Sequence, residues 1–171
     1  MDGVAPYPGA TDCLQELRNL GKRVILLSNA PRRASLVAKR LQSIGIPPRL
    51  YDQILTSGEA SRSALAERTD PRIAALGWQY FYIGPNRDQG LLKGLDYVCT
   101  DNLRKADFVL ATGVVNDNDQ LDQYETDLRT AASDQLPLIC ANPDHVVVRQ
   151  NGERVICAGA IAQKFKEMGG K

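Results

Sequence analysis

A hydroxyl and an amide side chain stand where a strand is expected to end, and both can bind an anion. Residues 24–27 form a short apolar run, and Ser28 and Asn29 follow it directly. Such a run is typical of a buried parallel strand, and ligands bind in open α/β sheets just beyond the carboxyl ends of these strands. A helix beginning at Pro31 would add N–H groups that attract an anion. The pattern predicts an anion site at Ser28 and Asn29, although the same pair would also suit a simple helix N-cap.

The elements that would position this site follow from the spacing of apolar residues. Leucines recur at helical spacing within 10–20, as do apolar residues within 31–44, and a glycine follows each of these segments. Strands that alternate with helices indicate an α/β fold with parallel sheets. The expected strands are 23–27, 54–56, 79–83, 97–99, 107–111 and 138–141. The expected helices are 10–20, 31–44, 58–68, 91–95, 120–132 and 159–168. Residues 146–157 are expected to form a hairpin with Asn-Gly at its turn.

Several short motifs resemble a known family when they are taken in order. Asp-Gly-Val-Ala-Pro-Tyr-Pro-Gly-Ala at 2–10, Leu-Ser-Asn-Ala-Pro-Arg at 27–32 and Thr-Ser-Gly-Glu-Ala at 56–60 resemble the haloacid-dehalogenase superfamily. The branch that they resemble most is the NagD-like, p-nitrophenyl-phosphatase-like one, whose members carry a large α/β cap. Asn-Pro-Asp at 142–144 and Gly-Ala at 159–160 resemble the cap of that branch. The resemblance covers nearly the whole chain.

The resemblance implies a partial Rossmann-like core with an inserted α/β cap domain. Residues 1–57 would be the partial core, without the family's first strand and its C-terminal strands. Residues 58–171 would be the cap, with the last residues leading back toward the core. Because burying each large aliphatic side chain stabilises a protein by roughly 1.5–3 kcal/mol, a core without its central strand is expected to fold poorly alone or to pair through another chain.

Phosphatases of this superfamily share an Asp-x-Asp nucleophile loop, a Ser or Thr after the second strand, a Lys, and an acidic pair that holds Mg²⁺. Only the Ser/Thr position is matched here, by Ser28. Asp2 has no strand before it, and Lys171 has neither strand nor loop around it, so neither takes over a family role. The resemblance therefore implies a chain truncated at both ends, without nucleophile or metal ligands, and inactive alone.

The resemblance also implies roles for a small set of residues. Ser28, as the catalytic candidate, and Asn29 would hold the transferring phosphoryl group, and Arg32 beside them would be a further phosphate contact. Asn142 and Asp144, together with the backbone at Gly159, would reach the leaving group from the cap. An Asx-type turn is an equally weighted explanation of the Asn-Pro-Asp motif.

Two acidic motifs could be mistaken for catalytic ones. Asp-Asn-Asp at 117–119 follows an apolar run, but it lacks the glycine of the nucleophile loop and leads into a polar helix. Capping of that helix explains it better. The segment 100–107 resembles an acidic metal loop, but Thr100 stands in place of the glycine and a strand follows where a helix should. Neither motif is expected to be catalytic.

Composition restricts the partners. The 171 residues are 43% hydrophobic and carry a net charge of +1, so nothing draws the chain to nucleic acid or to a membrane surface. No signal peptide or membrane-length apolar run is visible, and the cytoplasm is expected. His145, the single histidine, is expected at a strand edge. The four cysteines lack metal-site spacing and are expected to be reduced, mostly buried thiols: Cys13, Cys99, Cys140 and Cys157.

The function that the resemblance implies is Mg²⁺-dependent hydrolysis of small soluble phosphomonoesters through an aspartyl-phosphate. A small phosphorylated metabolite would be the partner, because a large cap excludes polymers. The alternative is a non-catalytic phosphate- or metabolite-binding α/β module. An unrelated nucleotide-binding protein is disfavoured, because no Gly-x-Gly-x-x-Gly follows a strand and no Walker-type motif occurs. Assembly into a homo-oligomer stays open.

Overall fold

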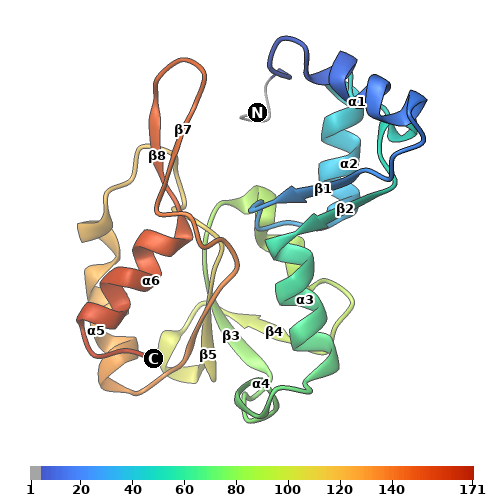
Figure 1. Ribbon diagram of the computed structural model, residues 1–171. Helices are drawn as coiled ribbons and strands as arrows, with labels where there is room; N and C mark the ends of the chain where they lie inside the picture. The colour runs from blue at the N-terminus through green and yellow to red at the C-terminus, as the bar shows by residue number, and fades with distance from the viewer. Residues whose placement is uncertain (1–4) are drawn as a thin grey trace.

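The computed structural model describes residues 5–171, and two α/β units lie side by side in it (Figure 1). The N-terminal unit, residues 5–56, has one parallel pair of strands, β1 and β2, in which Ser28 lies opposite Thr56. Its elements are α1 (Ala10–Asn19), β1 (Ile25–Ser28), α2 (Ala34–Ser43), the 3-10 turn η1 (Pro48–Leu50) and β2 (Gln53–Thr56).

The C-terminal unit, residues 57–171, is built on a four-stranded parallel sheet in the order β4-β3-β5-β6. An antiparallel hairpin, β7–β8, extends away from it (Figure 1). The elements are α3 (Ser57–Glu67), α4 (Pro71–Ala74), β3 (Gln79–Ile83), η2 (Asn86–Leu92), β4 (Val98–Thr100), η3 (Leu103–Lys105), β5 (Phe108–Ala111), η4 (Leu121–Tyr124), α5 (Glu125–Ser133), β6 (Leu138–Cys140), β7 (Val146–Val148), β8 (Arg154–Ile156) and α6 (Ala158–Glu167).

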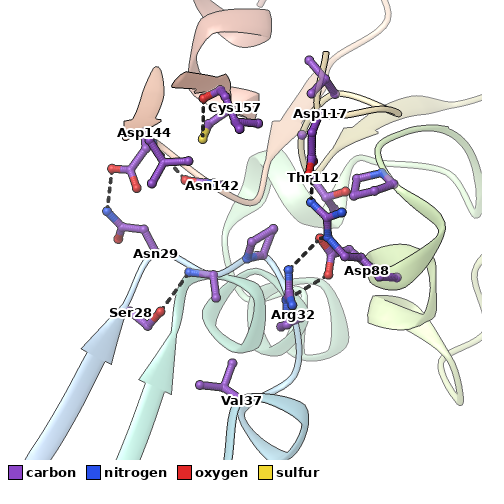
Figure 2. Close-up of a pocket in the computed structure, with 18 of the residues that line it drawn as sticks. Ser28, Asn29, Arg32, Val37, Asp88, Thr112, Asp117, Asn142, Asp144 and Cys157 are labelled. Atoms are coloured by element: carbon purple, nitrogen blue, oxygen red, sulfur yellow. Dashed lines mark hydrogen bonds and ion pairs between the residues drawn. The ribbon is translucent and has the colours of Figure 1, made fainter. Parts of the chain in front are cut away.

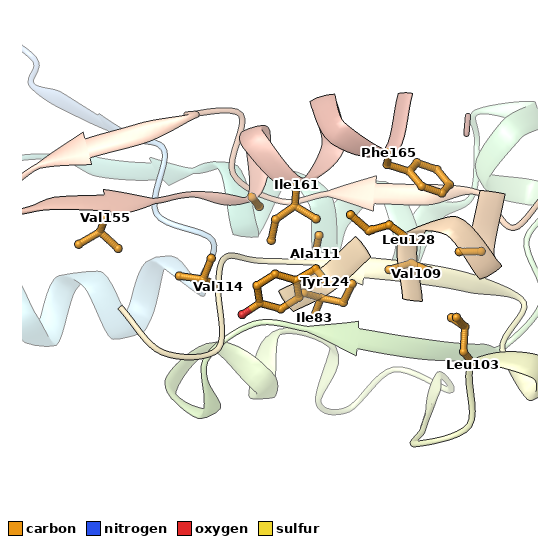
Figure 3. Packing of buried hydrophobic residues seen from close by; sticks show 12 residues of the cluster. Ile83, Leu103, Val109, Ala111, Val114, Tyr124, Leu128, Val155, Ile161 and Phe165 are labelled. Carbon is orange, nitrogen blue, oxygen red and sulfur yellow. The ribbon is translucent and has the colours of Figure 1, made fainter. Parts of the chain in front are cut away.

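Strand β5 is the centre of the C-terminal unit, and each of its four residues is buried. Val109 and Ala111 face a cluster that includes Leu128 of α5 and two residues of α6, Ile161 and Phe165 (Figure 3). The two remaining strand residues belong to a second cluster, with side chains from α3, β3 and η2. A strand covered on both faces needs apolar residues at every position, which explains why β5 is a continuous apolar run.

The strand pair of the N-terminal unit is covered on one face only. Leu26 and Ile54 pack into a cluster with residues of α1, α2 and η1. On the opposite face Ile25, Leu27 and Leu55 are 52%, 75% and 51% exposed, and Leu27 lies directly opposite Leu55. This half-covered sheet fits the expectation of a partial core, while the prediction that 1–57 folds poorly alone stays a prediction.

Three predicted features differ from the structure. The helix predicted over 31–44 begins only at Ala34, after a bend. The helix predicted over 91–95 is wrong, because the 3-10 helix η2 occupies Asn86–Leu92 and Gly94 then adopts a φ of 83°, which no right-handed helix allows. The helix predicted over 120–132 is split into η4 and α5.

The prediction of mostly buried thiols is also wrong. Cys13 and Cys99 are exposed and Cys140 is half-buried, so Cys157 alone of the four is buried. Cys13 lies on α1, which buries none of its residues, and Cys99 lies on the edge strand β4. Apolar neighbours in the sequence were therefore not a sufficient basis for predicting that Cys13 and Cys99 would be buried. Among residues 5–171, no helix is long and apolar enough to cross a membrane.

Candidate active site

A cavity of about 400 Å³ lies where the two units meet, and most of the predicted site residues line it (Figure 2). Its walls come from the loops that follow β1, β3, β5 and β6, from α2, and from the hairpin. The structure therefore brings together five residues from both units: Ser28, Asn29, Arg32, Asn142 and Asp144. The loops after β3, β5 and β6 meet because they leave the carboxyl edge of one parallel sheet, and the loop after β1 comes from the separate β1–β2 pair of the other unit.

Ser28 and Asn29 occupy the end of β1, as predicted. The Ser28 Oγ accepts a hydrogen bond from the N–H of Ala30 at 3.2 Å, and its hydroxyl proton can still be donated to an anion. The Asn29 side-chain amide donates to Asp144 Oδ1 at 2.8 Å (Figure 2). This bond joins residues 115 positions apart and ties the β1 loop to the C-terminal unit.

Arg32 makes an ion pair with Asp88, a residue that the sequence did not single out. The Arg32 Nε lies 2.9 Å from Asp88 Oδ1, and an Arg32 terminal nitrogen donates to Oδ2 at 3.3 Å. The side chain of Asp88 is only 2% exposed. Burial raises the pKa of Asp88, although the charges of Arg32 and Arg87 oppose the rise. Arg32 thus neutralises a buried carboxylate of the other unit, and its role as a phosphate contact stays a prediction.

The Asn-Pro-Asp motif forms the turn that was its alternative explanation. The backbone N–H of Asp144 donates to the Asn142 side chain at 3.0 Å, and Asn142 is buried. Gly159 packs against this turn, because its N–H donates to the Asp144 carbonyl at 3.0 Å and a Cβ there would lie 2.2 Å from the Pro143 oxygen. In this structure the Gly159 N–H therefore holds the turn, and Gly159 does not line the cavity.

A chain of ion pairs forms a further part of the cavity wall. Asp117 accepts a hydrogen bond from Arg87 at 3.1 Å and pairs with Arg149, which also contacts Glu153 at 2.8 Å. The hydrogen bond from Arg149 lowers the pKa of Asp117 most, and Arg87 adds to the effect. The two arginines lie 30 and 32 residues from Asp117, so no local signal in the sequence could have paired them with it.

The capping role predicted for the Asp-Asn-Asp motif is wrong. Gln120 caps the following turn through a capping box with Gln123. Asp117 faces the arginines, and Asp119 accepts hydrogen bonds from the Asn116 N–H at 2.9 Å and from the Tyr124 hydroxyl at 2.6 Å. Asp117 is thus paired with two distant arginines, and only Asp119 makes local contacts.

The acidic segment 100–107 and His145 do not line the cavity. In the segment 100–107, Asn102 accepts a hydrogen bond from the Arg104 N–H and Asp107 accepts one from Gln79, which are structural contacts. His145 is exposed, just before β7. The motif at Asp2 lies outside the described residues. Within residues 5–171, no three His, Cys, Asp or Glu side chains gather so that they could hold a metal, and the Mg²⁺ implied by the resemblance has no fitting donor set there.

Comparisons with known proteins agree on one family. A family model described as haloacid dehalogenase-like hydrolase matches residues 1–96. The crystal structure of a haloacid dehalogenase-like hydrolase from Brucella suis 1330 shares 32% identity, with a TM-score of 0.89 over 99% of this chain and 59% of that one. No protein in a curated collection matches.

Two further structures share the fold at lower identity. The p-nitrophenyl phosphatase from Archaeoglobus fulgidus is 21% identical, with a TM-score of 0.68 over 98% of this chain and 62% of that one. NagD from E. coli K-12 is 20% identical, with a TM-score of 0.64 over 100% and 62%. The chain thus spans about three fifths of the length of these structures, and the predicted α/β fold and family resemblance are confirmed.

Proposed function

Because the chain belongs to the haloacid dehalogenase-like hydrolases, we propose that it carries the phosphoryl-binding loop and the cap of a phosphohydrolase for small phosphomonoesters. The phosphoryl-binding loop is residues 28–33, and the C-terminal unit acts as the cap. Reaction through an aspartyl-phosphate with Mg²⁺ is part of the proposal. Within residues 5–171 no three His, Cys, Asp or Glu side chains gather to hold a metal. Inactivity of this chain alone is part of the proposal.

The observation that carries the proposal is the meeting of Ser28 and Asn29 with Asp144 across one cavity. The Asn29–Asp144 hydrogen bond of 2.8 Å closes the C-terminal unit over the end of β1. A cavity of about 400 Å³ is within the usual range of small-ligand sites. A cavity of this size would hold a small ester.

The residues of the chain would bind and orient the ester. The Ser28 hydroxyl would donate to a phosphoryl oxygen, and the Asp144 contact fixes the Asn29 amide for the same purpose. Apolar side chains of α2 and of the C-terminal unit line the remaining wall, among them Val37, Leu41 and Val114. They would surround the carbon part of the ester and keep water from it.

A chimaera with the Brucella suis hydrolase tests the proposal. Residues 5–171 would replace the segment they match in that protein, which supplies the remaining two fifths of the fold. With Mg²⁺ present, we expect the chimaera to hydrolyse p-nitrophenyl phosphate and to leave a phosphorylated protein such as casein intact. This chain alone should hydrolyse neither.

A folded chimaera without phosphatase activity would contradict the proposal. If this chain then bound inorganic phosphate equally well with and without Mg²⁺, the non-catalytic binding module would be favoured. Activity of this chain alone, removed by Asp117→Asn, would show that a carboxylate paired here with two arginines is the nucleophile after all.

A further inference from the structure

We propose that residues 56–59 are a brace that sets the shape of the phosphoryl-binding loop, with Gly58, Thr56 and Glu59 as positioning residues. The inference rests on the proposed function, because it assigns this loop to phosphate. The brace starts at Thr56, the residue opposite Ser28 in the β1–β2 pair, and continues into the first turn of α3. None of its four residues lines the cavity, so the brace acts on phosphate only through the loop.

Gly58 allows the loop backbone to lie against α3. A Cβ on Gly58 would lie 2.3 Å from the Arg32 nitrogen, 2.5 Å from the Pro31 carbonyl carbon and 2.8 Å from the Arg32 oxygen. All three atoms are backbone, so no side chain can rotate away to make room. The Gly58 N–H also donates to the Ala30 carbonyl at 3.1 Å. Glycine is therefore required at this position for close approach of two backbones.

Two hydroxyls fix the loop carbonyls on the side away from the cavity. The Thr56 Oγ1, in a residue only 1% exposed, donates to the Arg32 carbonyl at 2.7 Å and accepts from the Glu59 N–H at 2.9 Å. The Ser57 hydroxyl donates to the Ala30 carbonyl at 3.2 Å. Carbonyl oxygens repel an anion. Because the carbonyls of Ala30 and Arg32 are bonded to Ser57 and Thr56, the side of the loop that faces the cavity presents donor groups instead.

Glu59 caps a helix to which it does not belong. Its Oε2 accepts from the Ala34 N–H, the first residue of α2, at 2.9 Å, and both of its oxygens accept from the Arg33 Nε at 3.0 and 3.1 Å. Arg33, the N-cap residue of α2, offers no side-chain cap of its own. Burial raises the pKa of Glu59, but the Ala34 and Arg33 hydrogen bonds outweigh it, and the pKa lies below its ordinary value. Glu59 thus supplies the charge that a helix N-terminus favours and fixes where α2 begins.

The test compares phosphate binding by variants of this chain. Isothermal titration with inorganic phosphate would be run on the wild type, on Gly58→Ala and on the matched control Gly90→Ala, whose added Cβ would meet no atom within 4 Å. We expect Gly58→Ala to weaken phosphate binding about tenfold or more and Gly90→Ala to leave it unchanged. Equal binding by a folded Gly58→Ala variant would overturn the brace.

A second pair of variants keeps the test decisive if Gly58→Ala does not fold. Thr56→Val removes the hydroxyl and keeps the shape, and Thr56→Ser keeps the hydroxyl. We expect weaker phosphate binding by Thr56→Val and near wild-type binding by Thr56→Ser. Equal phosphate binding by Thr56→Val and Thr56→Ser would overturn the brace, because the Thr56 hydroxyl would then have no effect on the loop.

The failure of the brace can be told from the failure of the proposed function. If the wild type binds no phosphate, the proposed function fails, and the backbone amide NMR signals of Ala30 and of residues 32–34 decide whether the brace exists. Those signals should shift in Thr56→Val and stay in place in Gly90→Ala. Unmoved signals in Thr56→Val would overturn the brace.

Discussion

Replacing Ser28 by alanine in the chimaera is expected to lower kcat/KM for p-nitrophenyl phosphate about 10²–10³-fold. The hydroxyl at the end of β1 is the donor proposed for a phosphoryl oxygen, and alanine removes it. Ser28→Thr keeps a hydroxyl at the same point and should retain most of the activity, in line with the family's use of Ser or Thr there. Steady-state kinetics over a range of substrate concentrations measures both variants.

The matched control for this substitution is Ser43→Ala. Ser43 is exposed at the end of α2, where its hydroxyl donates to the Arg40 carbonyl at 2.8 Å, away from the β1 loop. Its removal should leave kcat/KM within about twofold, as for most exposed substitutions. Full activity of Ser28→Ala in a folded chimaera would mean that the phosphoryl group binds elsewhere.

Replacing Arg32 by leucine is expected to destabilise this chain by about 2–3 kcal/mol at pH 7. Loss of one partner from a buried ion pair typically costs about 3–5 kcal/mol, and we expect less because the Arg32 side chain is 30% exposed. Asp88, which is 2% exposed, would then keep only the more distant Arg87, at 4.0 Å, as an opposite charge. Urea unfolding of the wild type and of Arg32→Leu measures the difference in the free energy of unfolding.

The loss should depend on pH, with a sign that follows from Asp88. Burial raises the pKa of Asp88, so the folded protein holds this proton more tightly than the unfolded chain does, and removing Arg32 raises the pKa further. The penalty is therefore present above the ordinary carboxyl pKa of about 3.9 and fades as pH falls toward that value. The double variant Arg32→Leu, Asp88→Asn should recover most of the lost stability at pH 7. Equal destabilisation by Arg32→Leu at pH 4.5 and pH 7 would contradict this explanation.

The parts of the fold that the sequence predicted are those set by local patterns. The apolar run at 107–111 indicated the strand β5, and Asn-Gly marked the turn of the hairpin. Ser28 and Asn29 were found because a polar pair directly after a strand stands at the edge of a sheet where ligands bind. The strand itself was predicted to be buried, which is wrong, because Ile25 and Leu27 of β1 are exposed. The family motifs then brought Asn142 and Asp144 to the same site, which no local pattern could do across more than 100 residues.

The parts that were missed depend on partners far away in the chain. The start of α2 at Ala34 is set by Glu59, which lies 25 residues further on and belongs to another helix. The ion pair of Arg32 with Asp88, 56 residues away in the other unit, was not predicted, while the phosphate contact of Arg32 stays a prediction. Nothing in the local sequence of Arg32 or Asp88 carries this information, because it arises only when the two units pack together.

The central claim is that the loop after β1 binds the phosphoryl group, and titration of inorganic phosphate into the ¹⁵N-labelled chain tests it most directly. On addition of phosphate, we expect the backbone amide signals of Ser28, Asn29 and Ala30 to shift most, together with the side-chain amide signal of Asn29. The signals of the exposed strand β4, away from the cavity, should stay in place. Saturable shifts confined to another part of the chain, or none at phosphate concentrations in the tens of millimolar, about tenfold above a weak Kd of 1 mM, would contradict the claim.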